Sequence, residues 1–594
     1  MNDLIIRLNQ AIDHEYDAKN NEIDTQLELP LEDRVIKGET ISDVTVSFIS
    51  SPFVSNDNDI VFSTVRVSCA DNISKFREGS PVTLSGYGYS FALDVVEDNG
   101  ENMTLEMGYG MGTVSKRNNF KSGWQLDNAK VDIRHIVKKS TAILAYNQNK
   151  LNYLTEIFEG RTKPKFSESR KKTAWTYVEK TELNKTQKEA FVNAFATENF
   201  YLIQGPPGSG KTWLLAHLAV EFAKEGKKVL ITAFTHTAIN NALQKASTLS
   251  GYPHIVKVGK KFQTEGLYFD GSKAKNVTDF ARSGYDNSSK GIIVGATCYS
   301  PYTRKLDFMD WDIIIIDEAG QLTIPLAIAA MVKGGKYILI GDHKQLPPIV
   351  AENKDDIVFT KSIFEHLFKY NEGIMLDITY RMNKQINDFP SRQFYEGKLK
   401  PFSRNENWIL DVVNEFGKHK DILDISKPEV LFCHKHSSNQ SRSDFEANLV
   451  AELINEYVSK GLSGKDIAVI TPFRAQVRQI KKYVSKLPFY ERFKEDLLID
   501  TVERIQGQER DVIIYSLATS DPEKAKQRAD FFFNPNRFNV AITRARKKRI
   551  VIASISLFSI ETNDKKLQPL IKNFKDFYKD STVIEEQSDT QDLF

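Results

Sequence analysis

One stretch decides the fold of this chain: Phe200-Tyr-Leu-Ile-Gln-Gly205-Pro-Pro-Gly-Ser-Gly210-Lys-Thr212. It places the pattern G-x-x-x-x-G-K-[ST] after an apolar run typical of a buried strand and before another, residues 213–223, typical of a helix. Glycines in such a turn let backbone N–H groups surround a phosphate, and the helix N-terminus adds the positive end of its dipole. The pattern predicts a phosphate-binding loop made of Gly205, Pro206, Pro207, Gly208, Ser209, Gly210, Lys211 and Thr212.

Side chains suited to a nucleoside triphosphate lie in this loop and at the end of a second apolar run. Lys211 is placed to reach the β- and γ-phosphates, and the Thr212 hydroxyl to hold Mg²⁺. Four isoleucines, residues 313–316, precede Asp317 and Glu318. Opposite a phosphate loop, Asp317 is suited to bind Mg²⁺ through water and Glu318 to orient or deprotonate the attacking water. The alternative is a solvent-exposed strand end with two acids, but the two elements together predict a nucleoside triphosphatase.

Apolar strands alternate with helical stretches from residue 199 to about residue 555. Near-continuous apolar strands are typical of parallel sheets covered by helices on both faces. The rhythm restarts after about residue 370, so we predict the α/β fold class with two tandem parallel-sheet domains, residues 179–368 and 369–560. Residues 260–290 are expected to be an insertion in the first domain. Residues 561–594 are expected to form a helix and an acidic tail, disordered from Asp580.

The segment before these domains has a different pattern. Residues 1–127 hold a short helical stretch and then several short alternating strands with turn residues between them, one turn being Asp98-Asn99-Gly100, which predicts a small β-barrel accessory domain. Residues 128–178 have helical spacing and predict a stalk with a basic linker. Residues 161–172 hold six bases and one acid; they are interpreted as a solvated linker, with a nucleic-acid contact as the second interpretation.

Composition sets broader limits. The chain has 594 residues, 41% of them hydrophobic, and 80 basic against 78 acidic side chains, so it is neither disordered throughout nor strongly basic. Three scattered cysteines, Cys69, Cys298 and Cys433, fit a reducing compartment better than a disulfide framework or a zinc site. The acidic N-terminus is unlike a secretory signal, and no apolar run approaches the roughly 18 residues of a membrane span. We expect a cytoplasmic protein without a membrane span.

Nine motifs occur in an order and spacing that resemble a known family, the superfamily 1 helicases of the B branch, which includes the nonsense-mediated-decay helicase and its bacterial relatives. The resemblance covers roughly residues 180–555 and implies two RecA-like P-loop domains, with the β-barrel and helical stalk as accessory parts. The motifs are LNKTQ (183–187), GPPGSGKT (205–212), LITAFTHTAINNAL (230–243), DEAGQ (317–321), GDHKQLPP (341–348), LDITYRM (376–382), ITPFRAQ (470–476), DTVERIQGQERDVII (500–514) and NVAITRARKK (539–548).

The resemblance assigns two arginines of the second domain, Arg381 and Arg544, to the catalytic site as arginine fingers. A guanidinium stays charged at physiological pH and can contact two phosphate oxygens at once. Across a cleft it would stabilise the charge that develops in phosphoryl transfer. The other interpretation of Arg544 is that residues 543–548 are only a basic segment leading into a strand.

Four further nucleotide contacts follow from the resemblance. Gln187 would read the adenine edge, because an amide offers both a donor and an acceptor. Gln345 would sense the γ-phosphate. Tyr380 would stack on the base, with a core tyrosine as the alternative, and Glu509 would contact the ribose or phosphate side.

Nucleic acid is expected to cross the carboxyl ends of the strands of both domains. Hydroxyl, amide and backbone N–H groups suit phosphate contacts, and Phe473 could stack on a base. The alternative for several of these residues is helix capping, and His236 is expected to be structural or a phosphate contact. The candidates are Thr235, His236, Asn240, Thr297, Pro472, Phe473, Thr501 and Gln506.

Together these patterns predict an ATP-dependent helicase or translocase that uses ATP and Mg²⁺ and moves 5′ to 3′ on single-stranded nucleic acid, DNA slightly favoured over RNA. The direction comes from the resemblance alone. The alternative is an ATP-gated clamp or remodelling ATPase without strand separation. We also expect a monomer, and a weak resemblance of the terminal TQDLF (590–594) to sliding-clamp peptides makes such a clamp a candidate partner.

Overall fold

The computed structural model describes the chain except residues 1–2, 52–57, 70–71, 73, 77, 99–101, 109, 250–251, 253, 260–266, 268–273, 352–355, 372, 506 and 587–594. The chain forms two compact units. The first unit comprises residues 1–146 with 350–357, and the second comprises residues 147–349 with 358–594.

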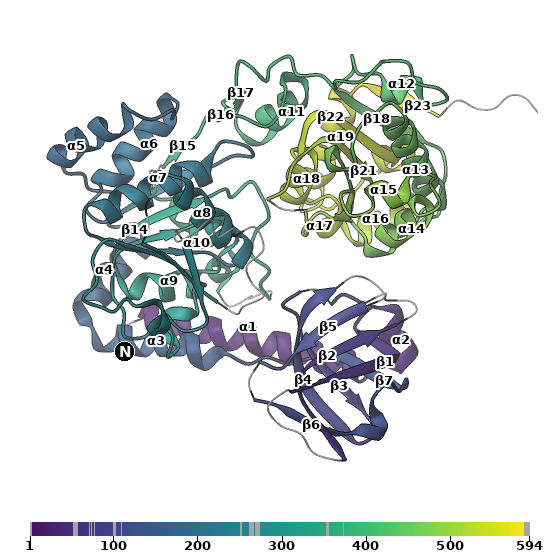
Figure 1. Ribbon diagram of the computed structural model, residues 1–594. Helices are drawn as coiled ribbons and strands as arrows, with labels where there is room; N and C mark the ends of the chain where they lie inside the picture. The colour runs from purple at the N-terminus through teal and green to yellow at the C-terminus, as the bar shows by residue number, and fades with distance from the viewer. Residues whose placement is uncertain are drawn as a thin grey trace, which may run out of the picture. The chain divides into compact units, whose positions relative to one another are not determined.

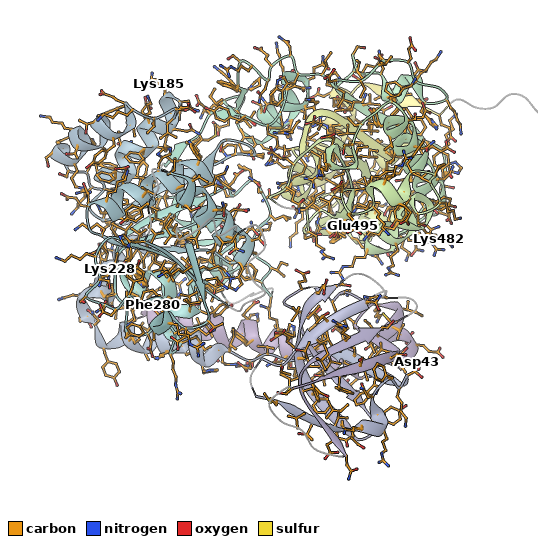
Figure 2. The ribbon with its side chains drawn as sticks, in the orientation of Figure 1. Asp43, Lys185, Lys228, Phe280, Lys482 and Glu495 are labelled. Atoms are coloured by element: carbon orange, nitrogen blue, oxygen red, sulfur yellow. The ribbon has the colours of Figure 1, made fainter. Side chains whose placement is uncertain are left out.

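The first unit contains a closed antiparallel barrel, and helices precede and follow the barrel in the sequence (Figure 1). Its strands run in the order β1-β7-β3-β4-β5-β2, and β1 pairs with β2 to close the ring, while β6 lies beside β2. At the bulge in β1, Asp43 takes a φ of 54° and is exposed at the barrel surface (Figure 2). The predicted barrel is confirmed. The elements are α1 (Asp3–Leu27), α2 (Leu31–Ile36), β1 (Thr40–Ser50), β2 (Asp59–Ser68), β3 (Pro81–Gly86), β4 (Tyr89–Asp98), β5 (Asn102–Glu106), β6 (Gly112–Ser115), β7 (Trp124–Asn128) and α3 (Arg134–Tyr146).

The second unit contains two parallel sheets with helices packed on them (Figure 1). The first sheet has eight strands in the order β11-β10-β12-β9-β13-β14-β8-β15. Its strands and helices are α4 (Gln148–Phe158), α5 (Glu168–Val178), α6 (Lys185–Ala196), β8 (Phe200–Gln204), α7 (Lys211–Lys224), β9 (Lys228–Thr232), α8 (His236–Thr248), β10 (Ile255–Val258), β11 (Ala274–Val277), β12 (Ile292–Gly295), β13 (Trp311–Ile316), α9 (Ile324–Val332), β14 (Gly334–Gly341), α10 (Ile363–Phe368) and β15 (Ile374–Met375).

The second sheet has six strands in the order β20-β19-β21-β22-β18-β23. A small parallel pair, β16 (Ile378–Thr379) and β17 (Lys400–Pro401), precedes it. Its elements are α11 (Lys384–Phe394), α12 (Lys420–Leu423), β18 (Glu429–His434), α13 (Asp444–Ser459), β19 (Ile467–Thr471), α14 (Arg474–Val484), α15 (Tyr490–Phe493), β20 (Leu498–Thr501), β21 (Arg510–Ser516), α16 (Pro522–Gln527), α17 (Ala529–Phe532), α18 (Pro535–Ile542), β22 (Ala545–Ser554), α19 (Gln568–Asp580) and β23 (Val583–Glu585).

The α/β fold class with two tandem parallel-sheet domains is therefore confirmed. The buried strands of both sheets are near-continuous apolar runs, as parallel strands covered on both faces require. Part of the expected insertion, residues 274–277, forms the edge strand β11 of the first sheet, while most of residues 260–273 lie outside the described chain. Below, the first and second sheet domains are the parts of the second unit built on these two sheets.

The expectation of disorder from Asp580 is wrong for residues 583–585. These residues form β23, which pairs in parallel with β18 through Leu431 and Val583. The prediction of disorder rested on the number of acidic residues in this segment. It overlooked Val583 and Ile584, which are β-branched and complete the edge of the sheet. The terminal TQDLF lies outside the described residues. None of the helices in the described part of the chain is long and apolar enough to cross a membrane.

Candidate active site

The phosphate loop joins the carboxyl end of β8 to the N-terminus of α7. Gly208 and Gly210 have φ angles of 72° and 75°, in the left-handed region that favours glycine. A Cβ at Gly208 would lie 2.5 Å from the Arg381 Cβ, and one at Gly210 would lie 2.6 Å from the Gln187 Nε2. Ser209 Oγ is buried and has no hydrogen-bond partner within the described structure. The loop therefore has its required backbone shape and one polar atom left for a ligand.

Lys211 and the acids after β13 form the charged centre of the site. Lys211 Nζ lies 2.6 Å from Glu318 Oε1. Burial, with a further contribution from Glu318, raises the pKa of Asp317 to about 7. Burial also opposes ionisation of Glu318, but Lys211, Arg544 and a hydrogen bond from Gln321 together lower the pKa of Glu318. One acid of the predicted pair is thus held ionised beside the phosphate loop.

The backbone around these acids is tightly constrained. Glu318 has a φ of 50°, which is unusual for a residue with a side chain. A Cβ at Gly320 would lie 2.7 Å from the Asp342 carbonyl oxygen, and one at Gly341 would lie 2.6 Å from the Gly320 nitrogen. The ends of β13 and β14 therefore need glycine at both positions to approach each other. Gln345 follows β14, is buried, and donates from Nε2 to Asp342 Oδ2 at 2.9 Å.

Arg381 and Arg544 lie together beside the phosphate loop. Arg381 Nε donates to Glu509 Oε2 at 2.6 Å, and Arg381 Nη1 to the Thr543 carbonyl at 3.1 Å. Arg544 is 2% exposed, donates from Nε to the Val540 carbonyl at 3.1 Å, and its buried Nη2 has no partner among the described groups. Burial, followed by repulsion from Arg381, lowers the pKa of Arg544 to about 9.

The two arginines thus share their surroundings with acids of both sheet domains. Arg544 interacts electrostatically with Glu318 of the first domain and with Glu509 of the second. Burial opposes ionisation of Glu509, but Arg381, Arg546 and Arg544 together lower the pKa of Glu509. Of the predicted residues, Glu318 therefore interacts with both Lys211 and Arg544.

Gln187 and Tyr380 also contact the phosphate loop. Gln187 donates from Nε2 to the Ser209 carbonyl at 2.9 Å and accepts through Oε1 from the Asn184 N–H at 3.0 Å. One amide hydrogen and one oxygen lone pair of Gln187 remain after these bonds. Tyr380 donates its backbone N–H to the Gly208 carbonyl at 2.8 Å, and its Oη accepts from Asn184 Nδ2 at 2.9 Å. The core-tyrosine alternative does not describe Tyr380, which is only half-buried beside the loop.

The expected nucleic-acid contacts in the described part of the chain lie just beyond or at the carboxyl ends of strands. In the first sheet, Thr235, His236 and Asn240 follow β9, and Thr297 follows the neighbouring β12. Thr235 Oγ1 accepts from the Ala238 N–H at 3.3 Å, so it caps α8, as the capping alternative predicted. Exposed Phe234, which sequence reasoning passed over, lies in the same turn with 49% of its surface accessible.

The second sheet holds the other expected contacts at its own strand ends. Pro472 and Phe473 follow β19, and Thr501 ends the neighbouring β20. The ring of Phe473 lies 5.6 Å from that of Phe531, so one part of it packs on the domain core. Gln506 lies outside the described residues.

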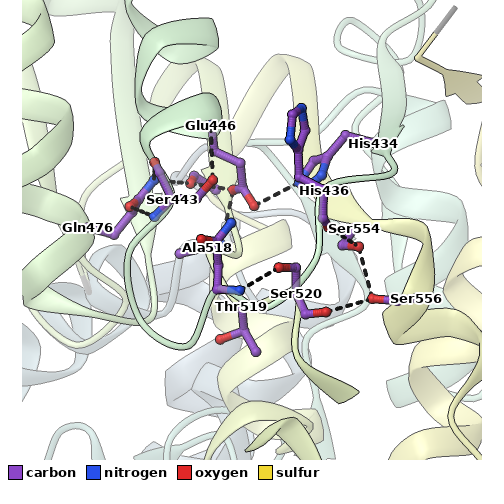
Figure 3. A network of polar contacts seen from close by, with 12 residues as sticks. His434, His436, Ser443, Glu446, Gln476, Ala518, Thr519, Ser520, Ser554 and Ser556 are labelled. Carbon is purple, nitrogen blue, oxygen red and sulfur yellow. Dashed lines mark hydrogen bonds and ion pairs between the residues drawn. The ribbon is translucent and has the colours of Figure 1, made fainter. Parts of the chain in front are cut away.

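A buried polar network joins the ends of β18 and β21 to α13 and α14 (Figure 3). Glu446 is fully buried and accepts hydrogen bonds from Ser516 Oγ at 2.6 Å and from the Ala518 N–H at 3.0 Å. Its other oxygen lies 3.0 Å from His434 Nε2. Gln476 of the ITPFRAQ motif donates from Nε2 to Ser516 Oγ at 3.0 Å. The network fixes α13, α14 and the ends of β18 and β21.

Sequence reasoning missed Glu446 because its signal looks ordinary. Ser443 and Glu446 have the S-x-x-E spacing of a helix capping box, and Ser443 Oγ does accept from the Glu446 N–H at 3.2 Å. The carboxylate, however, turns to β21. Nothing in the sequence indicates that choice, since Ser516 is 70 residues away.

The described residues fit Mg²⁺ only as a cation shared with a nucleotide. No group of three or more His, Cys, Asp or Glu side chains in the described ranges could hold a metal alone. Mg²⁺ is commonly held by one or two protein oxygens together with phosphates and water. Buried Asp317 at the end of β13 and Thr212 in the first turn of α7 provide that kind of partial ligand set.

Two family models, both described as an AAA domain, match this chain. One matches residues 182–278 and 273–353, and the other matches residues 359–556. The DNA replication ATP-dependent helicase/nuclease DNA2 of Xenopus laevis is 28% identical over 409 residues, which covers 63% of this chain and 37% of that protein. DNA2 of Saccharomyces cerevisiae is 29% identical, over 63% of this chain and 26% of that protein. This chain therefore matches well under half the length of these relatives.

Among solved structures, the arterivirus nonstructural protein 10 (helicase) covers 92% of this chain and 83% of its own, at 13% identity and a TM-score of 0.38. A likeness at that TM-score adds nothing to the fold described above. The family models and the DNA2 relatives support the broader part of the resemblance, a superfamily 1 helicase, and ATP as the nucleotide. They do not distinguish the B branch.

Proposed function

We propose that this chain is an ATP-hydrolysing helicase or translocase of superfamily 1, B branch, acting on single-stranded nucleic acid. The observation that carries the proposal is the meeting of charges from both sheet domains: Lys211 and Glu318 from the first, Arg544 from the second. A simple nucleotide-binding protein needs only the phosphate loop. Arginines from a second domain beside that loop are what couples hydrolysis to a change between domains.

In the proposed reaction, the Lys211 ammonium binds the β- and γ-phosphates. These phosphates compete with Glu318 for the ammonium. Glu318, ionised and then free of Lys211, orients the attacking water and accepts its proton. Arg381 and Arg544 contact the γ-phosphate oxygens as negative charge develops. The unpartnered Nη2 of Arg544 and Ser209 Oγ are the donors left for this purpose. Gln187 and Tyr380 orient the base, and Glu509 positions Arg381.

Asp317 and Thr212 would hold Mg²⁺. The cation would neutralise phosphate charge and orient the β- and γ-phosphates. Asp317 Oδ1 already accepts the backbone N–H of Glu318 at 2.9 Å, so one oxygen of Asp317 has a fixed direction. Gln345 would respond to the presence of the γ-phosphate and transmit this response through its hydrogen bond to Asp342.

Strand contacts are proposed at the carboxyl ends of β9, β12, β19 and β20. Thr235, His236 and Thr297 would hold one part of the backbone, and Phe473 the next. The side chains of Asn240, Pro472 and Thr501 are buried, so these residues would act by holding the strand ends in place. The names of the DNA2 relatives favour DNA over RNA as the substrate. Movement from 5′ to 3′, the monomeric state, cytoplasmic location and a sliding-clamp partner remain predictions from the sequence.

An ATPase assay with single-stranded DNA, single-stranded RNA or no polymer tests the proposal. We expect hydrolysis stimulated more by DNA than by RNA, and displacement of a duplex with a 5′ but not a 3′ overhang. Stimulated hydrolysis without displacement on either substrate would favour the ATP-gated clamp. An ATPase rate that neither polymer changes would contradict both.

A further inference from the structure

The carboxylate of Asp342, at the end of β14, has a full set of donors. Its Oδ1 accepts from Gln204 Nε2 and from the Lys344 N–H, both at 3.1 Å. Its Oδ2 accepts from Gln345 Nε2 at 2.9 Å and from Tyr395 Oη at 2.7 Å. A carboxylate offers about four acceptor positions, so this group has one orientation. Gln345 and Tyr395 meet on the same oxygen.

Tyr395 carries this contact into the second sheet domain. It follows α11, is 2% exposed, and packs in the core of that domain. Its hydroxyl donates its single hydrogen to Asp342 and accepts from Asn539 Nδ2 at 2.9 Å. Burial and the Asp342 carboxylate raise the pKa of Tyr395 well above its ordinary value, so the hydrogen stays on the phenol.

Asn539 of α18 completes the link to the first sheet domain. Its Nδ2 also donates to the Lys344 carbonyl at 2.8 Å, so both amide hydrogens are used. The alternative amide orientation would place Oδ1 against that carbonyl oxygen, which disfavours it. A parallel bond runs from Asn536 Nδ2 to the His343 carbonyl at 3.0 Å. Helix α18 is therefore attached to the loop that carries Gln345.

The same helix leads directly to both arginines. Thr543, one turn after Asn539, donates from Oγ1 to the Asn539 carbonyl at 2.6 Å. Arg544 donates from Nε to the Val540 carbonyl, and Arg381 donates from Nη1 to the Thr543 carbonyl. A shift of α18 would therefore move the contacts of both guanidinium groups.

We propose that Tyr395 and Asn539 are positioning residues that couple Gln345 to Arg544, so that contact of Gln345 with the γ-phosphate sets the position of the arginines. The inference rests on the proposed ATPase function and adds the route of hydrogen bonds between Gln345 in the first sheet domain and Arg544 in the second. Neither residue touches the nucleotide in this scheme. The bonds that run from Gln345 through Asp342 and Tyr395 to Asn539 join buried groups, where an unmade hydrogen bond is costly and the geometry is well defined. The bonds of α18 to the His343 and Lys344 carbonyls are partly buried.

Tyr395→Phe tests the route because it removes only the hydroxyl. Tyr201→Phe is the matched control: Tyr201 is 6% exposed, and its Oη accepts from Asn193 Nδ2 at 3.1 Å, away from the route. Tyr395→Phe loses two buried hydrogen bonds and Tyr201→Phe loses one partly buried bond, so a merely structural role predicts a lower thermal midpoint for Tyr395→Phe but unchanged kinetics in both variants. The coupling role predicts that Tyr395→Phe lowers kcat about tenfold, the loss of one hydrogen bond to a charged group, with KM for ATP within about twofold. Tyr201→Phe should change neither constant.

The double variant that combines Tyr395→Phe with Asn539→Ala should have a kcat no lower than that of the less active single variant, because both substitutions break the same series of hydrogen bonds. Independent, multiplicative losses would overturn the proposal. So would a kcat of Tyr395→Phe equal to that of the wild type.

Hydrogen exchange separates this proposal from the proposed function. On addition of a non-hydrolysable ATP analogue, the amides of α18 should exchange more slowly in the wild type and in Tyr201→Phe, and the slowing should be lost in Tyr395→Phe. If the wild type does not hydrolyse ATP, the proposed function fails while this readout still decides the coupling. Equal slowing in all three proteins would overturn the coupling even if hydrolysis is normal.

Discussion

Replacing Arg544 by methionine tests whether this arginine serves catalysis or the fold. The side chain is 2% exposed, and its firmest hydrogen bond is to the Val540 carbonyl of its own domain. Burial, followed by repulsion from Arg381, lowers the pKa of Arg544 to about 9. A charge whose pKa is lowered in the folded state destabilises that state. A residue kept under such conditions is expected to have a functional role.

The two effects of the substitution have opposite signs. At 1.36 kcal/mol per pKa unit, the charge costs the fold at most about 5 kcal/mol, partly offset by the hydrogen bonds that methionine would lose. The thermal midpoint of Arg544→Met should therefore equal or exceed that of the wild type. The transition state, by contrast, should lose an arginine contact that is worth about 10³–10⁵ in rate in related phosphoryl transfers.

The assay is steady-state ATP hydrolysis with saturating single-stranded DNA, together with thermal unfolding of the same samples. We expect kcat to fall by at least about 10³, nucleotide affinity to change by less than about tenfold, and the melting temperature to stay or rise. Lys548→Met is the matched control, because Lys548 is also a buried base, at 0% exposed, but bonds to the Asp424 and Lys427 carbonyls, outside α18 and the site. A normal kcat with a lower melting temperature in Arg544→Met would refute the assignment.

Three further substitutions test separate parts of the site. Glu318→Gln should lower kcat by about 10²–10⁴ while equilibrium binding of ATP is retained; undiminished hydrolysis would remove Glu318 from the chemistry. Gly341→Ala should lower the unfolding free energy by about 1–3 kcal/mol, because its Cβ would lie 2.6 Å from the Gly320 nitrogen, whereas Gly417→Ala, with its nearest neighbour at 3.6 Å, should be tolerated. Phe234→Ala should weaken single-strand binding by about 1–3 kcal/mol, and Phe308→Ala, 43% exposed before β13, should not; equal affinities would exclude stacking on Phe234.

Local sequence context explains which features could be predicted. The phosphate loop, the acids after β13 and the parallel sheets each depend on residues within about one strand and one helix of each other, and the fold class is confirmed. The route from Asp342 through Tyr395 to Asn539 joins residues 53 and 144 positions apart. A tyrosine after a helix looks like an ordinary core residue until its hydroxyl partner is known. Strand β23 was missed for a related reason, because its partner β18 lies about 150 residues earlier.

The distribution of hydrogen bonds between the sheet domains bears on how a motor could work. The arginines are held mainly by their own domain: Arg381 by Glu509 and Thr543, and Arg544 by Val540. The acids and Lys211 are held by the first domain, where glycines 320 and 341 fix the backbone.

Several bonds among the described residues cross from one sheet domain to the other, each with a neutral donor. At the phosphate loop, the Tyr380 N–H donates to the Gly208 carbonyl, and Asn184 Nδ2 donates to Tyr380 Oη. Asn536 and Asn539 donate to backbone carbonyls, and the Tyr395 hydroxyl donates to Asp342. A typical hydrogen bond contributes only about 0.5–1.5 kcal/mol net, so separating the domains at these points costs a few kcal/mol. ATP hydrolysis releases more than that, and each half of the site would keep its own geometry while the domains part. A site with rigid halves and a weak, specific junction is what a cycle of closing and opening requires.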